Sequence, residues 1–476
     1  MRRYLRVVPG LAEVMRLHGG AALGVVTALA ALGLAVSATP AAARASAPRL
    51  TGVRCLPLDT PACHDRVRVA IGSKLVLRGR RLQTGMRVTF RWTRGALATK
   101  LRRTRAGWTV RVPAGSRAGR VSLAVRSRSG LRSNARRITV TATRLALRQQ
   151  DGLPAVFRGN GMWIWYVSGS DAGNVDAIAA RARGAGMSTV FVKSSDGTRA
   201  WTQFSPQLVQ ALHARGLRVC AWQFVYGARP DGEARLGAAA AGAGADCLVI
   251  DAESQYEGRY VSAQRYIAQL RAAVGPSYPI GLTSFPYVDY HPRLPYSVFL
   301  APGAAQANLP QVYWKDIGAS VDAVSARTVA HNRIYGVPMA PLGQAYGGPR
   351  PRDLRRFRAI WAAYGAGGLS WWSWQSASSA TWGTLAEPQP APIAAVDPGW
   401  PALERGAAGD EVVWLQQHLS AVHDSVPIDG RFGASTEASL KALQRSRNLS
   451  ASGETDAATW LAVLALPIQA VEWTNR

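Results

Sequence analysis

The sequence predicts an α/β protein built around a TIM (β/α)8 barrel, with a small Ig-like β-sandwich before it and a small three-helix domain after it. Three observations support this prediction. Residues 162–374 alternate eight strand-like runs with mostly helical stretches. Residues 50–149 contain short strand-like runs punctuated by Gly and Ser. Residues 401–467 carry apolar side chains at helical spacing.

Length and composition agree with a folded chain of several domains. Of its 476 residues, 48% are hydrophobic and 18% are charged, which excludes a mostly disordered protein. A single apolar run approaches the length of a membrane span, which excludes a polytopic membrane protein. Residues 50–149 hold 24 of the 57 basic residues but 2 of the 28 acidic ones. The chain therefore joins one strongly basic module to a nearly neutral body.

Residues 1–47 have the pattern of an export signal. Four arginines precede an apolar run from Gly19 to Ala38, and Ala-rich sequence follows at residues 41–47. A basic segment, an apolar segment and an A-x-A site are typical of a secretory signal peptide, and an uncleaved anchor is the alternative. Either form predicts a secreted or cell-wall-associated protein.

The four cysteines form two candidate pairs. Cys55 and Cys63 flank a short Pro-containing loop, and we expect them to be oxidised outside the cell. Cys220 and Cys247 lie in two predicted neighbouring strands, where a disulfide and two buried thiols are both consistent with the sequence. The chain has no C-x-x-C motif, and its histidines do not cluster. We therefore expect no metal site and no cofactor.

The basic module at residues 50–149 is predicted to be a β-sandwich. The stretch VRVPAGSRAGRVSLAVRSRSGLRSNARRITV resembles the IPT/TIG group of immunoglobulin-like domains. Its strand-like runs are Lys74–Leu77, Met86–Trp92, Trp108–Val112, Arg120–Val125 and Arg137–Thr141. The charge is consistent with adhesion to anionic wall polymers, with an inert solvated surface or with nucleic-acid binding. Aromatic residues are too sparse for base stacking, which disfavours a dedicated nucleic-acid role.

The barrel is predicted for residues 155–385. A doubly wound sheet is the alternative, but no Gly-rich phosphate motif follows the first strand. The expected helices are Val175–Arg183, Pro206–Arg215, Glu233–Ala243, Tyr260–Val274, Val321–Ala330 and Arg352–Tyr364. The expected strands are Met162–Val167, Thr189–Lys193, Arg218–Phe224, Cys247–Asp251, Ile280–Ser284, Gln311–Trp314, Ile334–Pro338 and Gly368–Trp374.

Asp251 and Glu253 are the main catalytic candidates. Chemistry in such barrels occurs at the carboxyl ends of the strands, and both acids end the fourth predicted strand. Residues i and i+2 of a strand share a face, so both carboxylates should lie at the barrel mouth. Two crowded carboxylates tend to separate into an acid and an anion, as glycoside hydrolysis requires. A structural pair neutralised by Arg259 or Lys193 is the alternative.

Aromatic and amide side chains at other strand ends suggest a carbohydrate site. Sugar rings stack on indole rings, and amides bind their hydroxyl and acetamide groups. The candidate substrate-binding residues are Trp222, Gln223, Gln311, Trp314, Trp372, Trp374 and Gln375.

The segments VIDAES, QVYW and WWSWQ resemble strand ends of glycoside-hydrolase barrels, namely family 25 muramidases and chitinase-type enzymes. This resemblance implies that Glu253 is the general acid, that Asp251 orients the 2-acetamido group of the substrate and that Tyr313 assists it. The first predicted strand departs from the muramidases, because it carries Trp163 and Trp165 where they have an Asp.

A Pro-rich linker at residues 386–400 precedes the C-terminal domain, residues 401–467. The domain sequence resembles the three-helix peptidoglycan-binding domain, with Arg405-Gly406, Asp429-Gly430, Phe432-Gly433 and Thr459-Trp460 among its matching positions. Most of these positions are expected to be core. Asp429 and Arg431 are the expected exposed peptidoglycan contacts.

These features predict an exported bacterial cell-wall protein with peptidoglycan or another wall glycan as partner. The first hypothesis is a muramidase- or glucosaminidase-like glycosidase that hydrolyses β-1,4 bonds of peptidoglycan or a related N-acetylated glycan. The second is a non-catalytic peptidoglycan- or envelope-binding protein with a degenerate barrel. An amidase or a hydrolase of another polysaccharide is a third reading.

Overall fold

The computed structural model describes residues 46–474 except 56–67, 71–72, 94, 105–106, 114–115, 118, 142–151, 391–392, 394–396 and 424–425. The predicted signal and the Cys55–Cys63 pairing lie outside the described residues. Within the described part of the chain, every helix is too short or too polar to cross a membrane. The described residues from Pro48 onward form one compact unit by their contacts.

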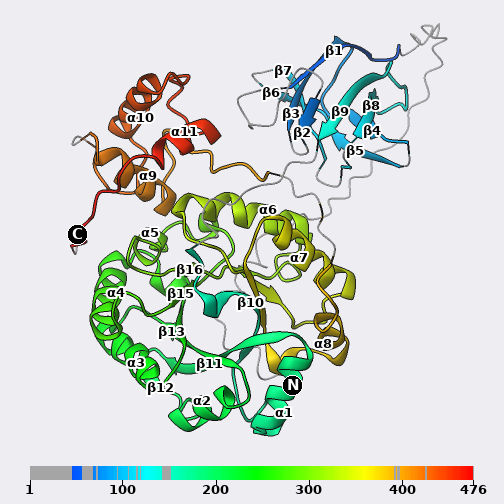
Figure 1. The fold of residues 1–476 in the computed structure, drawn as a ribbon. Helices are drawn as coiled ribbons and strands as arrows, with labels where there is room; N and C mark the ends of the chain where they lie inside the picture. The colour runs from blue at the N-terminus through cyan, green and yellow to red at the C-terminus, as the bar shows by residue number, and fades with distance from the viewer. Residues whose placement is uncertain are drawn as a thin grey trace, which may run out of the picture. The chain divides into compact units, whose positions relative to one another are not determined.

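The predicted β-sandwich is present. Its sheets have the strand orders β1-β3-β7-β6 and β2-β9-β8-β4-β5 (Figure 1). Apolar residues alternate along the strands and meet in one core between the sheets, while arginines take the outward positions. The strands are β1 (Arg49–Cys55), β2 (Arg68–Ala70), β3 (Lys74–Arg80), β4 (Arg87–Arg91), β5 (Ala96–Lys100), β6 (Arg102–Thr104), β7 (Gly107–Arg111), β8 (Gly119–Arg126) and β9 (Arg136–Thr141).

The predicted barrel is also present, as a parallel sheet surrounded by helices (Figure 1). Its sixth strand is interrupted at Leu309–Pro310, where proline offers no N–H to the ladder. The first part of this strand pairs with β15 and the second with β18, so the ring closes. The strands are β10 (Gly159–Ile164), β11 (Met187–Asp196) with its short partner β12 (Arg199–Ala200), β13 (Arg218–Val225), β14 (Cys247–Ala252), β15 (Ile280–Thr283), β16 (Ala307–Asn308), β17 (Gln311–Val312), β18 (Leu342–Gln344) and β19 (Gly368–Trp372).

The barrel helices lie close to their predicted positions. Asn174, Ser205, Ser320 and Ser378 cap α1, α2, α6 and α8 by accepting a backbone N–H with their side chains. The Pro-rich connection after β15, where no helix was expected, contains the single turn α5. The helices are α1 (Val175–Gly184), α2 (Pro206–His213), α3 (Pro230–Gly242), α4 (Tyr260–Val274), α5 (Tyr296–Phe299), α6 (Val321–Asn332), α7 (Pro351–Ala363) and α8 (Ser379–Leu385).

The predicted seventh strand, Ile334–Pro338, is wrong. Arg333–Tyr335 forms a 3-10 turn that ends at Gly336, whose positive φ of 68° stops an extended strand. The strand at this position of the barrel is β18, Leu342–Gln344, between β17 and β19. The Ile334 run is apolar because it is buried against other parts of the chain.

The C-terminal domain has the three predicted helices α9 (Asp410–Ser420), α10 (Ala434–Ser446) and α11 (Ala457–Val463). Leu415, Leu440 and Trp460 lie in its core and are fully buried. The domain also contacts the barrel: the Asp410 carboxylate accepts hydrogen bonds from Tyr260 and Tyr335 of the barrel.

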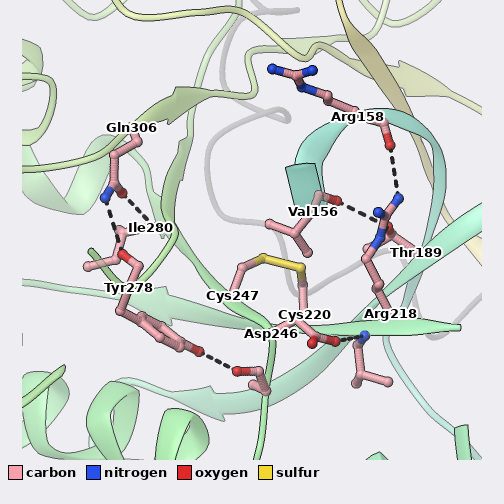
Figure 2. The surroundings of a disulfide bond; sticks show 12 residues. Val156, Arg158, Thr189, Arg218, Cys220, Asp246, Cys247, Tyr278, Ile280 and Gln306 are labelled. Atoms are coloured by element: carbon pink, nitrogen blue, oxygen red, sulfur yellow. Dashed lines mark hydrogen bonds between the residues drawn. A yellow bond between two sulfur atoms is a disulfide. The ribbon is translucent and has the colours of Figure 1, made fainter. Parts of the chain in front are cut away.

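Cys220 and Cys247 form a disulfide between the adjacent strands β13 and β14 (Figure 2). It lies near the amino ends of both strands, where Asp246 accepts the backbone N–H of Val219 at 2.7 Å. The amino-terminal face of such a barrel serves stability, and catalysis occurs at the opposite face. The bond therefore connects two strands below the candidate site.

We expect replacement of both Cys220 and Cys247 by Ala to lower the free energy of unfolding by about 3 kcal/mol, because the bond closes a loop with a sequence separation of 27. Denaturant unfolding with and without a reductant measures this effect. Reduction should destabilise the parent by about that much more than the variant, since both proteins keep Cys55 and Cys63. Equal stability of the two proteins under oxidising conditions would contradict the prediction.

Candidate functional site

The two predicted carboxylates lie together at the carboxyl end of β14. Every residue of this strand is buried, and Asp251 pairs in register with Thr283 of β15. Glu253 follows the strand directly, so it lies nearer the rim than Asp251 does. The side chains are 6% and 8% exposed, respectively. As predicted, both acids occupy one face of the strand.

Gln311 joins the two carboxylates. Its Nε2 donates to Oδ1 of Asp251 at 3.1 Å and to Oε1 of Glu253 at 3.0 Å, so these oxygens are at most about 6 Å apart. The backbone N–H of Gln311 donates to Ser284 of the neighbouring strand, which fixes the position of the amide. The predicted substrate contact is thus a residue that holds the acid pair.

The surroundings of the pair favour the protonated form of both carboxyl groups. Burial raises the pKa of Asp251 well above its usual range, and the neighbouring Glu253 raises it further. Burial also raises the pKa of Glu253. The Gln311 hydrogen bonds and the positive charge of Lys193 oppose both shifts. Neither carboxylate forms a salt bridge within the described residues, so neutralisation by Lys193 acts through its nearby charge and not through an ion pair.

Lys193 is a buried cation beside the acid pair. Its side chain is 2% exposed, and its Nζ donates to Oδ2 of Asp196 at 2.7 Å. The ring centroids of Trp165, Trp201 and Trp222 lie 5.0, 4.7 and 4.7 Å from the ammonium. Lys193 was predicted as a counter-ion of the acid pair in the structural alternative and was not among the predicted site residues. Its position in the sequence could have indicated this orientation, because it lies on β11 two residues after the inward-facing Phe191.

Four tryptophans line the interior of the barrel beneath this cation. They include the predicted Trp222 and Trp372, whose rings are 5.3 Å apart, together with Trp163 and Trp165. Tyr166 stacks on Trp165 at 5.9 Å and is 44% exposed. Trp222 therefore fills the core, whereas Tyr166 offers an accessible aromatic face that the sequence analysis missed.

Tyr313, the predicted acetamide partner, is 8% exposed and packs edge-on against Tyr346 at 5.4 Å. Burial raises its pKa well above the usual range, and the negative charges of Asp251 and Glu253 raise it further. Tyr313 therefore keeps its hydroxyl proton, and it lies close enough to both carboxylates to interact with them electrostatically.

Two predicted substrate contacts lie on the outer side of their strands. Gln223 follows the inward-facing Trp222, so strand alternation turns it toward the helices, where it donates to Glu233 and accepts from Tyr266. Trp314 stacks on Phe357 of α7 at 5.3 Å. The structure does not bring either residue to the acid pair.

Two further candidates support loops. Trp374 packs on Trp382 of α8 at 4.7 Å and donates from its indole N–H to Asp171. Gln375 donates to the Ser170 hydroxyl at 2.7 Å. Both residues hold the segment after β10 in place, and among the described residues neither forms a hydrogen bond with the carboxylates.

Asp429 and Arg431 are exposed, as predicted, on the turn before α10. Oδ1 of Asp429 accepts from the Gln416 amide at 2.9 Å and from the backbone N–H of Arg431 at 2.8 Å. These bonds fix the turn and leave the Arg431 guanidinium at the surface.

Comparison with known proteins identifies the C-terminal region. Residues 408–463 match the family described as "Putative peptidoglycan binding domain". This match confirms the predicted three-helix module, so the chain contains a peptidoglycan-binding domain. No curated protein matches the chain.

Solved structures that resemble this protein include glycoside hydrolases. A chitinase from Chromobacterium violaceum shares 12% identity over 48% of this chain and 98% of its own, with a TM-score of 0.36. The Bacillus cereus spore cortex-lytic enzyme SleL shares 9% identity over 52% of this chain and 76% of its own, with a TM-score of 0.37.

Proposed function

We propose that this protein is an exported, cell-wall-associated glycosidase that hydrolyses β-1,4 bonds of peptidoglycan or a related N-acetylated glycan. The observation that carries the proposal is the buried Asp251–Glu253 pair, bridged by Gln311 at the carboxyl end of a barrel strand. The peptidoglycan-binding domain on the same chain supports the wall glycan as the substrate. The basic sandwich adds contacts to anionic wall polymers.

The separation of the carboxylates limits the mechanism. An inverting pair leaves room for a water and lies about 6.5–9.5 Å apart, which exceeds the limit that Gln311 sets here. A short separation fits a mechanism with retention, in which a nucleophile attacks the sugar from the face opposite the leaving group. On an N-acetylated glycan, the 2-acetamido oxygen of the substrate can be that nucleophile.

In the proposed reaction, Glu253 gives its proton to the glycosidic oxygen as the C1–O bond breaks. The acetamide oxygen forms a bond to C1, while a carboxyl oxygen of Asp251 accepts a hydrogen bond from the acetamide N–H. The Tyr313 hydroxyl, still protonated because its pKa is raised, donates to the acetamide. Water then attacks C1, the C1–O bond to the acetamide breaks, and a proton returns to Glu253.

The test is the release of reducing ends from purified sacculi by the full chain. We expect release from N-acetylated sacculi and little from chemically N-deacetylated sacculi, because deacetylation removes the nucleophile. Borohydride labelling of the new end distinguishes a muramidase from a glucosaminidase. The Asp251→Asn/Glu253→Gln double variant is the control.

A chain that pellets with sacculi but releases no sugar would establish the alternative, a non-catalytic wall-binding protein. The burial of both carboxylates favours that alternative, because a substrate must displace the side chains that cover them. Equal release by the parent and the double variant would place catalysis elsewhere.

Lys193 provides a prediction with a defined sign. Its charge lowers the pKa of both Asp251 and Glu253, so Lys193→Met should raise the pKa values of both. An acid with a raised pKa stays protonated to higher pH, so the alkaline limb of the pH–rate profile should move upward. Lys441→Met, which removes a lysine paired with Glu437 in the C-terminal domain, is the control. A lower rate without a shifted limb would show a purely structural role.

A further inference from the structure

The outward face of the sandwich sheet β5-β4-β8-β9 concentrates positive charge. Residues 66–150 contain no Asp or Glu at all, so the described part of this face carries no carboxylate. The inward positions of the same strands, such as Val88, Phe90 and Leu123, are fully buried in the core. Strand alternation therefore sends every arginine of β4 to the outside.

Strand register arranges these cations in rows. Arg87 of β4 lies opposite Lys100 of β5 and Arg126 of β8. Two rows further along β4, Ser122 of β8 separates Arg91 from Arg137 of β9. Neighbouring strands are about 4.8 Å apart, and residues i and i+2 along a strand are about 7 Å apart. The two cationic rows thus lie about 13 Å apart.

The row between them consists of small side chains. Thr89 of β4 lies opposite Ala98 of β5 and Ala124 of β8. Thr89 and Ala124 of this row line a surface groove of about 260 Å³, together with the three arginines Arg91, Arg126 and Arg132. A floor of small side chains leaves room for an extended chain between the guanidinium groups.

The side chain of Arg126 is held in position by the hairpin beside the groove. Arg126 and Arg132 face each other across a β-bridge, and Nε of Arg126 donates to the Gly130 carbonyl at 3.1 Å. The Ser127 hydroxyl accepts the backbone N–H of Leu131, which fixes the hairpin between them. The outer guanidinium nitrogens of Arg126 stay available, and paired guanidinium N–H groups match the oxygens of a phosphate.

We propose that this groove, hereafter the arginine groove, binds a wall phosphodiester polymer, a polyol- or sugar-phosphate chain. The small floor and the fork-shaped donors favour a thin, repeating phosphate chain over a protein surface. Nucleic acid fits less well, because the described face presents no aromatic ring for base stacking. The assignment to the wall rests on the proposed function, whereas the phosphate chemistry rests on the groove itself.

The test compares two triple variants of the full chain that lose the same charge. Arg91→Gln/Arg126→Gln/Arg132→Gln removes the arginine groove. Arg49→Gln/Arg78→Gln/Arg80→Gln removes exposed arginines of β1 and β3 in the other sheet. Binding of fluorescent poly(glycerol phosphate) is measured against salt concentration. Unfolding transitions confirm that both variants are folded.

We expect the groove variant to lose about tenfold or more in affinity at 0.15 M salt, and its slope of log K against log salt to fall by about two units. The control variant should change little. Equal losses in both variants would reduce the effect to net charge and overturn the proposal. Equally tight binding of poly-glutamate would overturn the phosphate preference.

A single-stranded DNA that binds the arginine groove more tightly than poly(glycerol phosphate) would replace the wall polymer with nucleic acid. Sugar release from sacculi stripped of phosphate polymers should be the same for the parent and the groove variant. Failure of the glycosidase proposal would appear in that release assay alone, so the two proposals fail independently.

Discussion

Glu253→Gln should lower the rate of sugar release from sacculi by at least about 100-fold, the usual contribution of a general acid. The replacement keeps the size of the side chain, and its amide oxygen can still accept the hydrogen bond from Gln311. It cannot supply a proton to the leaving oxygen. Binding to sacculi should be unchanged, because the peptidoglycan-binding domain is untouched. Reducing-end release and pelleting, measured on the same preparation, separate the two effects.

Glu257→Gln is the matched control for this experiment. Glu257 lies four residues further along the same loop, but it pairs with His291 and has no contact with Gln311 or Asp251. It should retain most of the activity. Loss of activity in both variants would indicate general damage to the loop, and full activity of Glu253→Gln would refute its role as the acid.

The acid pair could be predicted from sequence because it depends on short-range geometry. A buried strand that runs directly into D-x-E places both acids on one face, whatever the rest of the barrel does. The same alternation explains the missed contacts. Gln223 follows the inward-facing Trp222 and must point outward, so it binds Glu233 instead of substrate. The residue types at a strand end thus indicate where the rim of the barrel lies. Which of these residues face the interior depends on their alternation along the strand.

Lys193 was harder to assign because a charge inside an aromatic interior is unusual. A lysine at a strand end is normally solvated. Here Asp196 and three tryptophans surround the ammonium, and their interactions with it offset the cost of removing it from water. Trp201 lies beyond the end of β11, and the folded chain brings its ring to the Lys193 ammonium. The prediction of the seventh strand was wrong for a related reason. Ile334 is apolar because distant residues bury it, and local pattern cannot distinguish that burial from a strand.

The contact between the barrel and the peptidoglycan-binding domain had no local signal at all. Asp410 begins α9 and is completely buried. Its carboxylate accepts hydrogen bonds from the Tyr260 hydroxyl at 2.8 Å, the Tyr335 hydroxyl at 2.7 Å, and both the backbone N–H and the hydroxyl of Ser297 at 2.8 and 2.7 Å. Trp414 adds an indole hydrogen bond to the Ile334 carbonyl at 2.7 Å.

This contact changes how the binding domain can act. A module on a flexible linker raises the local substrate concentration over a broad volume. Here the end of the predicted linker is itself held, because Asp397 forms a salt bridge at 3.1 Å with Arg333, whose guanidinium lies over the Trp400 ring. We therefore expect the bound glycan strand to meet the barrel in a restricted set of orientations.

Asp410→Ala should lower the free energy of unfolding by about 3–5 kcal/mol, because it leaves several buried donors without an acceptor. Denaturant unfolding of the full chain at neutral pH measures the loss. Asp456→Ala is the matched control. Asp456 caps α11 of the same domain by accepting the Thr459 N–H, and such a cap is worth about 1 kcal/mol.

The same variant also tests whether the fixed attachment matters for function. If the contact orients the wall glycan, Asp410→Ala should lower sugar release from intact sacculi more than release from short soluble glycan fragments, which need no second binding site. Binding to sacculi should persist, since Asp429 and Arg431 remain exposed on their turn. Equal losses on both substrates would instead show that Asp410 acts through stability alone, and a loss of stability no larger than that of Asp456→Ala would show that the buried cluster does not hold the domains together.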